Sequence, residues 1–242
     1  MNKKKKTLLI TSVVVFLLVA TCIIYINDYY HADDMAMDCV ENPTEGIKVT
    51  ENVDERIVFE PENATVGFVF YPGGKVEYEA YAPLMEKLAE QGVLCVLLHM
   101  PANLAVLDVN AADGIQEEFP NITEWYIGGH SLGGSMAASY LGEHAEEYEG
   151  LILIASYSTA DLKGTDLNVL SIYGENDQVL NVGKYRDNKD NLPEDYKEMI
   201  IEGGNHAYFG SYGEQDGDGK ANISNAEQIE FAANEIEKML AD

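Results

Sequence analysis

The sequence has few basic residues. Its 242 residues include 15 Lys and Arg against 42 Asp and Glu, which gives a formal net charge of −27. Four of the basic residues stand together at 3–6, so the rest of the chain is more acidic still. Nucleic acid and anionic membrane surfaces repel such a surface, and the composition therefore argues against both as partners of the folded part.

Cysteine is also scarce, and the three that occur do not make a disulfide framework. Cys22 lies in an apolar N-terminal run, Cys95 in a predicted core strand and Cys39 in a polar segment. A bond between Cys39 and Cys95 would have to join a buried strand to a linker, so we expect free thiols. Free thiols occur in cell-surface and cytosolic proteins alike, so the cysteines do not identify the cellular compartment of the protein.

The N-terminus predicts a membrane anchor. Residues 1–6 form a short basic segment, and residues 7–26 are 20 residues without a charge, which is about the length needed to cross a bilayer core. No small-x-small cleavage site follows, which favours an uncleaved signal-anchor, with a cleaved signal peptide as the alternative. The lysines should stay in the cytoplasm. We therefore expect a single-pass protein of the cell membrane with an extracytoplasmic C-terminal domain, or a secreted domain if the segment is cleaved.

Residues 27–50 predict a linker, and residues 51–242 predict one folded domain. The linker is polar and acidic without clear periodicity, so we expect it to keep the domain off the membrane. In the domain, apolar strands alternate with amphipathic helices, which predicts an α/β fold: a mostly parallel sheet with helices on both faces. The expected strands are 56–59 (an edge strand), 66–71, 93–98, 125–127, 151–154, 169–173 and 198–201, and the expected helices are 81–88, 109–115, 136–141 and 225–240.

A glycine-rich stretch, Gly129-His130-Ser131-Leu132-Gly133, carries the main functional signal. It matches the G-x-S-x-G pattern, in which a serine nucleophile stands on a sharp turn between a strand and a helix. An apolar strand precedes Ser131 and good helix formers follow it, as this context requires. A Cβ at Gly129 or Gly133 would clash in so tight a turn. We therefore expect Ser131 to be a nucleophile.

A serine nucleophile needs a histidine base, and in this arrangement the base follows the serine and the acid in the sequence. Two histidines follow Ser131, namely His144 and His206. His144 ends the helix after the nucleophile and should point away from the turn. His206 follows the last strand and is the predicted base.

The acid that orients this base is expected after the preceding strand. Gly174-Glu175-Asn176-Asp177 supplies two carboxylates in that loop. Asp177 is the predicted acid and Glu175 the runner-up, with an ordinary turn aspartate as the alternative for Asp177.

The oxyanion of the reaction needs preorganised N–H donors. The amide of Leu132, at the start of a helix, is the first expected donor. The second should come from the loop after strand 66–71, where we favour Gly74 and place Lys75 next. The alternative for this loop is a tight glycine turn without a catalytic role.

Together these residues resemble the α/β-hydrolase fold, and in particular its compact bacterial members similar to dienelactone hydrolases. The resemblance covers about residues 53–240. It implies acyl hydrolysis through an acyl-enzyme, with Ser131 as nucleophile, His206 as base and Asp177 orienting the base. Dienelactone hydrolases use cysteine as the nucleophile, so the serine leaves the substrate open. The motifs that carry the resemblance are Tyr71-Pro72-Gly73-Gly74-Lys75, Gly129-His130-Ser131-Leu132-Gly133, Gly174-Glu175-Asn176-Asp177 and Asn205-His206.

Two further features bear on the ligand. No long insertion separates strand 151–154 from strand 169–173, so we expect no large cap domain and a preference for small or exposed acyl groups. Glu214, Asp216 and Asp218 imitate part of a calcium loop, but the first position is Glu and the twelfth is Asn225. We expect neither a metal nor a cofactor.

The sequence thus predicts a membrane-anchored serine hydrolase that cleaves a small ester, thioester or lactone. Its partners would be a small-molecule acyl substrate and the membrane, without nucleic acid, and no oligomeric state follows. A peptidase or acyltransferase with the same triad stays open. A second class of function, a catalytically silent extracellular binding module on a hydrolase scaffold, also stays open.

Overall fold

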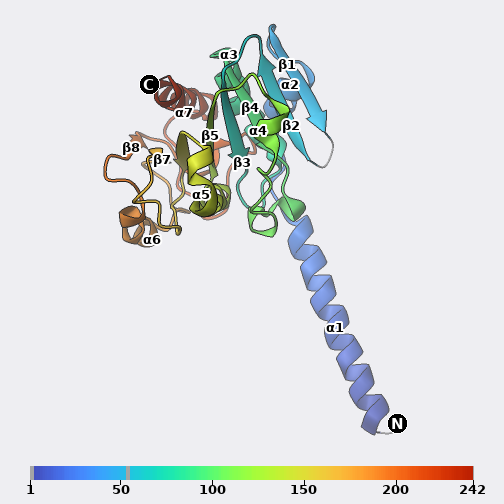
Figure 1. Cartoon of the computed structure of the whole chain (residues 1–242). Helices are drawn as coiled ribbons and strands as arrows, with labels where there is room; N and C mark the ends of the chain where they lie inside the picture. The colour runs from blue at the N-terminus through green and yellow to red at the C-terminus, as the bar shows by residue number, and fades with distance from the viewer. Residues whose placement is uncertain (1–2, 53–54, 242) are drawn as a thin grey trace.

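The computed structural model of the chain describes residues 3–52 and 55–241. A long N-terminal helix, α1 (Lys3–Asn27), projects from a domain that contains the sheet (Figure 1). The stretch Ile10–Asn27 of this helix has a mean hydropathy of 2.4, and none of it is buried inside the structure. By length and composition α1 suffices to cross a membrane, and a signal sequence has the same properties.

Within the described residues, the domain is built on an eight-stranded sheet with the order β1-β2-β4-β3-β5-β6-β7-β8. The strands from β3 to β8 pair in parallel, whereas β1 and β2 join antiparallel at one side. This confirms the mostly parallel sheet. The strands are β1 (Ile47–Asn52), β2 (Arg56–Pro61), β3 (Val66–Tyr71), β4 (Val93–Leu98), β5 (Glu124–His130), β6 (Gly150–Ile154), β7 (Asn168–Gly174) and β8 (Lys197–Ile201).

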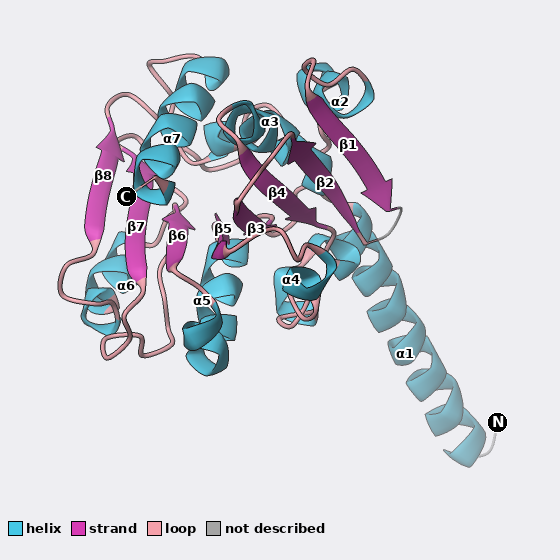
Figure 2. Cartoon of the chain, turned by 45° about the horizontal axis from the view of Figure 1, so that its top comes forward, coloured by secondary structure: helices cyan, strands magenta, loops and turns pink. Residues whose placement is uncertain are grey.

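Helices cover both faces of the sheet, as expected (Figure 2). Apolar side chains of α3 and α7 form the core on one face, and those of α4 and α5 form the core on the other. A capping box between Ser224 and Glu227 begins α7. The helices besides α1 are α2 (Asp34–Glu41), α3 (Ala82–Glu90), α4 (Ile115–Glu118), α5 (Leu132–His144), α6 (Val182–Asp187) and α7 (Asn225–Leu240), with short 3-10 helices that include η1 (Tyr78–Tyr81), η2 (Pro101–Asn103) and η3 (Ala105–Leu107).

The connection between β6 and β7 is short. Residues 155–167 join these strands, which leaves no room for a large cap domain. The carboxyl ends of the parallel strands, where ligands bind in sheets of this kind, therefore have no cap from this connection.

The segment predicted as an acidic linker is folded. Asp33 caps α2 by accepting hydrogen bonds from the N–H groups of Met35 and Ala36, each at 3.1 Å. The helix packs on α3, and β1 begins at Ile47, so the expected domain boundary at residue 51 falls inside a strand. Backbone pairing with β2, the cap on α2 and the packing of Cys39, Val40 and Ile47 on the apolar core order this segment.

Two local predictions were wrong. The strand 56–59 was expected at the edge of the sheet, but β2 pairs on both sides and β1 forms the edge. The helix expected over 109–115 consists of turns up to α4. The physical reason is the Tyr71 hydroxyl, which donates to the Val109 carbonyl at 2.8 Å and accepts from the Ala112 N–H at 3.1 Å. These backbone groups therefore bond to a distant side chain and not to one another in a helix.

Candidate active site

Ser131 stands on a sharp turn between β5 and α5, as the sequence predicts. Its backbone angles are φ 53° and ψ −119°, a strained conformation for a residue with a Cβ. The turn is held from the neighbouring strand, since the Ser131 N–H donates to the Ile154 carbonyl at 2.9 Å and the Ser156 hydroxyl donates to the Ser131 carbonyl at 2.7 Å. The surrounding structure thus supports the strained serine.

The glycines on either side of Ser131 are sterically required. A Cβ at Gly129 would lie 2.3 Å from the Tyr71 carbonyl oxygen, and one at Gly133 would lie 2.2 Å from the same atom. Both distances are shorter than any real contact of a Cβ atom, and backbone atoms cannot rotate away. The steric reason given for these glycines is therefore confirmed.

His206 and Asp177 meet in a buried ion-pair geometry. His206 Nδ1 lies 2.8 Å from Asp177 Oδ2, and the two side chains are 2% and 1% exposed. The other carboxylate oxygen, Oδ1, accepts from the N–H groups of Val179 and Leu180 at 2.9 and 2.8 Å. These two donors fix the carboxylate, so that Oδ2 faces the imidazole and holds its proton on Nδ1. The Nε2 lone pair of a neutral His206 is then available as a base.

The other candidates for acid and base lie elsewhere. The Glu175 carboxylate accepts from the Gly203 N–H at 3.0 Å and is not bonded to His206. His144 lies at the end of α5, where its Nδ1 is 2.9 Å from Glu147 Oε1. The structure therefore brings together the predicted pair, Asp177 and His206, and not the runners-up.

The two predicted oxyanion donors belong to residues that touch. A Cβ at Gly74 would lie 2.9 Å from Cδ2 of Leu132, so the loop after β3 passes directly over the start of α5. Within the residues that the structure describes, the N–H groups of Gly74 and Leu132 have no hydrogen-bond partner. The neighbouring Gly73 N–H donates to the Tyr81 hydroxyl at 3.1 Å and is occupied. Gly74 and Leu132 thus retain free donors beside Ser131.

His130, for which the sequence predicted no role, lies next to the His206–Asp177 pair. Its ring lies against the His206 ring, with centroids 4.5 Å apart, and its Nδ1 is 2.8 Å from the Tyr81 hydroxyl. Because that hydroxyl accepts from Gly73, its own proton points to Nδ1, which places the proton of a neutral His130 on Nε2. Burial and the nearby His206 hold the pKa of His130 well below its ordinary value. His130 is therefore a neutral support for the candidate base.

The sequence also did not predict Asp218 as a site residue. Its Oδ2 accepts from the Ala207 N–H at 2.9 Å and its Oδ1 from the Gln178 N–H at 3.2 Å. Ala207 and Gln178 directly follow His206 and Asp177, so this carboxylate joins the loops of the candidate base and acid. The only sequence signal was the acidic turn that imitates a calcium loop. Among the described residues no cluster of metal-binding side chains occurs.

A cavity of about 830 Å³ lies at another place, between the β8 edge and α7. Its lining includes Ile223, Phe231 and the runner-up acid Glu175, but not Ser131, His206 or Asp177. The chemistry of the candidate site is therefore separate from this cavity.

Comparison with known proteins gives the same architecture. The sequence model described as the alpha/beta hydrolase family matches residues 67–230. No curated protein matches the sequence. Three solved structures show the similarity in fold at low identity. Dienelactone hydrolase from Anabaena variabilis is 15% identical with a TM-score of 0.59, over 78% of this chain and 97% of its own.

The other two similar structures are esterases by name. Est1E from Butyrivibrio proteoclasticus is 13% identical with a TM-score of 0.56, over 82% of this chain and 100% of its own. A thermostable esterase from Pseudomonas putida is 16% identical with a TM-score of 0.60, over 85% of this chain and 87% of its own.

Proposed function

The chain belongs to the alpha/beta hydrolase family, and we propose that it is a membrane-anchored serine hydrolase that cleaves small esters, thioesters or lactones. The observation that carries this proposal is the 2.8 Å contact between His206 Nδ1 and Asp177 Oδ2, beside a serine held on a strained turn. A binding module would not need a serine, an acid and a base in this order and arrangement. The apolar helix α1 supports the anchor.

The proposed reaction proceeds in two stages. Ser131 Oγ attacks the acyl carbonyl carbon while His206 Nε2 takes the hydroxyl proton, and the carbonyl oxygen becomes an oxyanion. The N–H groups of Leu132 and Gly74 stabilise this oxyanion. The intermediate collapses, the bond to the alcohol or thiol breaks, and His206 returns the proton to that leaving group. An acyl group is then left on Ser131.

Water completes the cycle. His206 Nε2 takes a proton from a water molecule whose oxygen attacks the acyl carbon, and a second oxyanion forms in the same place. Its collapse releases the carboxylic acid, and the proton passes back to Ser131 Oγ. Asp177 stabilises the imidazolium in both stages and keeps the productive tautomer.

A fluorophosphonate probe tests this proposal, because it labels an activated serine and leaves ordinary hydroxyls unmodified. We expect one label per wild-type chain and none on Ser131→Ala. The matched control is Ser139→Ala, since Ser139 is exposed on the same helix and should not affect labelling. An unlabelled wild type, or equal labelling of Ser131→Ala, would overturn the assignment.

A further inference from the structure

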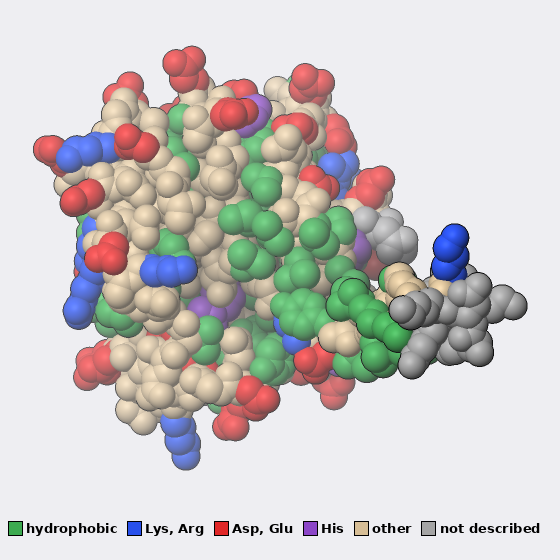
Figure 3. Space-filling view, turned by 90° about the horizontal axis from the view of Figure 1, so that it is seen from below, with side chains coloured by type: hydrophobic (Ala, Val, Ile, Leu, Met, Phe, Trp, Pro, Cys, Tyr) green, Lys and Arg blue, Asp and Glu red, His purple; other side chains and the backbone are tan. Residues whose placement is uncertain are grey.

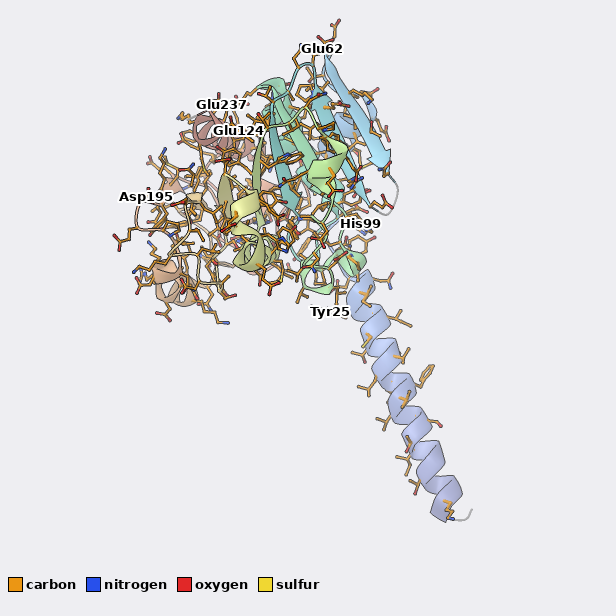
Figure 4. All side chains as sticks on the ribbon, viewed as in Figure 1. Tyr25, Glu62, His99, Glu124, Asp195 and Glu237 are labelled. Carbon is orange, nitrogen blue, oxygen red and sulfur yellow. The ribbon has the colours of Figure 1, made fainter. Side chains whose placement is uncertain are left out.

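The anchor helix ends on the loop that carries a candidate oxyanion donor. The ammonium of Lys75, next to Gly74 in the chain, lies 2.7 Å from a carboxylate oxygen of Asp28 and 4.8 Å from the ring centroid of Tyr25. Figure 4 labels Tyr25 at the end of α1 that meets the domain. α1 also contacts η2, whose Asn103 carbonyl accepts from the Lys75 N–H at 2.8 Å. The loop is held between the helix end and η2.

The segment that follows α1 is bonded directly to the domain. Tyr30 pairs with the same loop, since its N–H donates to the Lys75 carbonyl at 2.8 Å and its carbonyl accepts from the Glu77 N–H at 2.9 Å. The Tyr30 hydroxyl accepts from the Asp216 N–H at 3.0 Å, in the segment that follows His206. Residues after the helix therefore touch both loops of the candidate site.

These contacts fix the height of the site above a bilayer. Tyr30 is the third residue after Asn27, the end of the apolar helix, and an extended chain spans at most about 11 Å over these three residue steps. The headgroup region on each side of a bilayer core is about 5–8 Å thick. Whatever tilt α1 adopts, the loop from Gly73 to Glu77 is held at or just above the headgroups.

The face that meets the bilayer carries apolar side chains. Val106 and Leu107 of η3 are 53% and 59% exposed, and η3 packs on α5, the helix that starts after Ser131. Figure 3 shows hydrophobic side chains gathered on the face from which α1 projects. Two aromatic residues at the helix end, Tyr25 and Tyr29, are the type that settles at a membrane interface. The domain is strongly acidic, so apolar contact and the tether, rather than charge attraction, hold this face to lipid.

We propose that the site acts on an amphiphile embedded in the adjacent leaflet, and removes from it a small acyl group esterified at headgroup level. This inference rests on the proposed function and adds the place where the substrate lies. The site has no large cap, and the bilayer itself covers its open side. Ser131 takes the acyl group, the amphiphile leaves as the free alcohol and remains in the membrane, and water releases the small acid.

A matched pair of substrates tests the inference. Both are butyrate esters of a fluorescent hydroxycoumarin, one soluble in water and one bearing a long alkyl chain that holds it in vesicles. The full chain is reconstituted in phosphatidylcholine vesicles, and release of the coumarin is followed. We expect wild type to prefer the vesicle-held ester at equal bulk concentration.

The discriminating variant carries a flexible Gly/Ser insertion of about 20 residues between Asn27 and Asp28, which lets the domain drift by about 25 Å. The rate on the vesicle-held ester should fall at least about tenfold while the rate on the soluble ester is kept. The control carries the same insertion after Asn2 and should behave as wild type. An unchanged rate on the vesicle-held ester overturns the inference. A parallel fall on both esters also overturns it, because the helix end would then act on the site itself.

A second variant addresses the apolar face. Val106→Ser with Leu107→Ser should lower the ratio of vesicle-held to soluble turnover by about threefold or more. Phe231→Ser removes an equally exposed side chain, 53% accessible, on the distant α7 and should leave that ratio unchanged. Equal ratios in both variants contradict the inference. If wild type hydrolyses neither ester and takes no fluorophosphonate label, the proposed function itself fails.

Discussion

The ring of His130 lies against the ring of His206 at an angle of 48°, with 4.5 Å between centroids. One histidine is the candidate base, and the other, next to the candidate nucleophile, is buried and bonded to Tyr81. The residue before Ser131 thus positions the base that would activate Ser131. This contact ties the strand-to-helix turn to the loop after β8.

Replacement of Asp177 by asparagine should abolish most activity through the tautomer of His206. The carbonyl oxygen of the new side chain will stay with the Val179 and Leu180 N–H groups, because only an acceptor satisfies both. Its NH₂ group then faces Nδ1 and forces the imidazole proton onto Nε2, which can no longer accept from Ser131. We expect kcat to fall on the order of 10³–10⁴-fold, measured with a butyrate ester. Glu175→Gln is the control and should lose little, since Glu175 is exposed.

Tyr81→Phe should destabilise the domain and also impair catalysis. The change leaves the Gly73 N–H and His130 Nδ1 buried without their partner, and each such group costs about 1–3 kcal/mol. We expect chemical denaturation, followed by fluorescence of the single tryptophan, Trp125, to show the loss. Tyr173→Phe offers a comparison, because Tyr173 is only partly buried. Equal stability of the two variants would show that the Tyr81 hydroxyl contributes nothing to folding.

Acid should destabilise the fold through His130. Burial and the nearby His206 lower its pKa in the folded state, while the unfolded chain takes up a proton near the ordinary value of 6.5. The unfolded state therefore binds more protons below pH 6.5, and the free energy of unfolding falls as pH is lowered, by up to about 1.4 kcal/mol per pH unit. Denaturation at pH 8, 6 and 5 measures the slope. His130→Gln should show a smaller slope below pH 6.5, and identical slopes would refute this role.

Two glycines of α5 should respond in opposite ways to alanine. A Cβ at Gly133 meets backbone oxygens at 2.2 and 2.3 Å, so Gly133→Ala should unfold the turn and remove activity. At Gly142 the nearest atom is the Ala160 Cβ at 3.4 Å, and the position is exposed in the helix. Gly142→Ala should therefore stabilise the fold by about 0.5–1 kcal/mol. Thermal unfolding and ester hydrolysis compare the two. Loss of stability in both variants would contradict the steric explanation.

Patterns that depend on local chemistry could be read from the sequence. The continuous apolar runs identify the buried parallel strands, and the glycines around Ser131 identify the turn because backbone oxygens of Tyr71 and Pro72 exclude any Cβ. Ser131, Asp177 and His206 each follow a strand of the parallel sheet, and successive parallel strands end at one side of the sheet, so the sequence places the three at the same side. These features need only the properties of neighbouring residues.

Features set by distant partners were beyond the sequence. Val109, Ala112 and Ile115 have helical spacing, yet the Tyr71 hydroxyl binds the backbone at the first two positions and holds turns there. In β1 only Ile47 and Val49 alternate as apolar residues facing the core, a pattern too short to identify a strand by itself, and pairing with β2 completes the strand. In the sequence Asp218 resembles an ordinary surface acid, because its partners, the N–H groups of Ala207 and Gln178, belong to loops that come together only in the folded chain.

The carboxylate of Asp218 has a consequence for how this chemistry can evolve. Because it fastens the segment after Asp177 to the segment after His206, the acid and the base are held to each other by contacts that do not involve the side chain of Ser131. The nucleophile is then a replaceable component. If position 131 carries a different nucleophile, such as a thiol, His206 and Asp177 still supply an oriented base. The reaction can then change while the residues that transfer the proton stay the same.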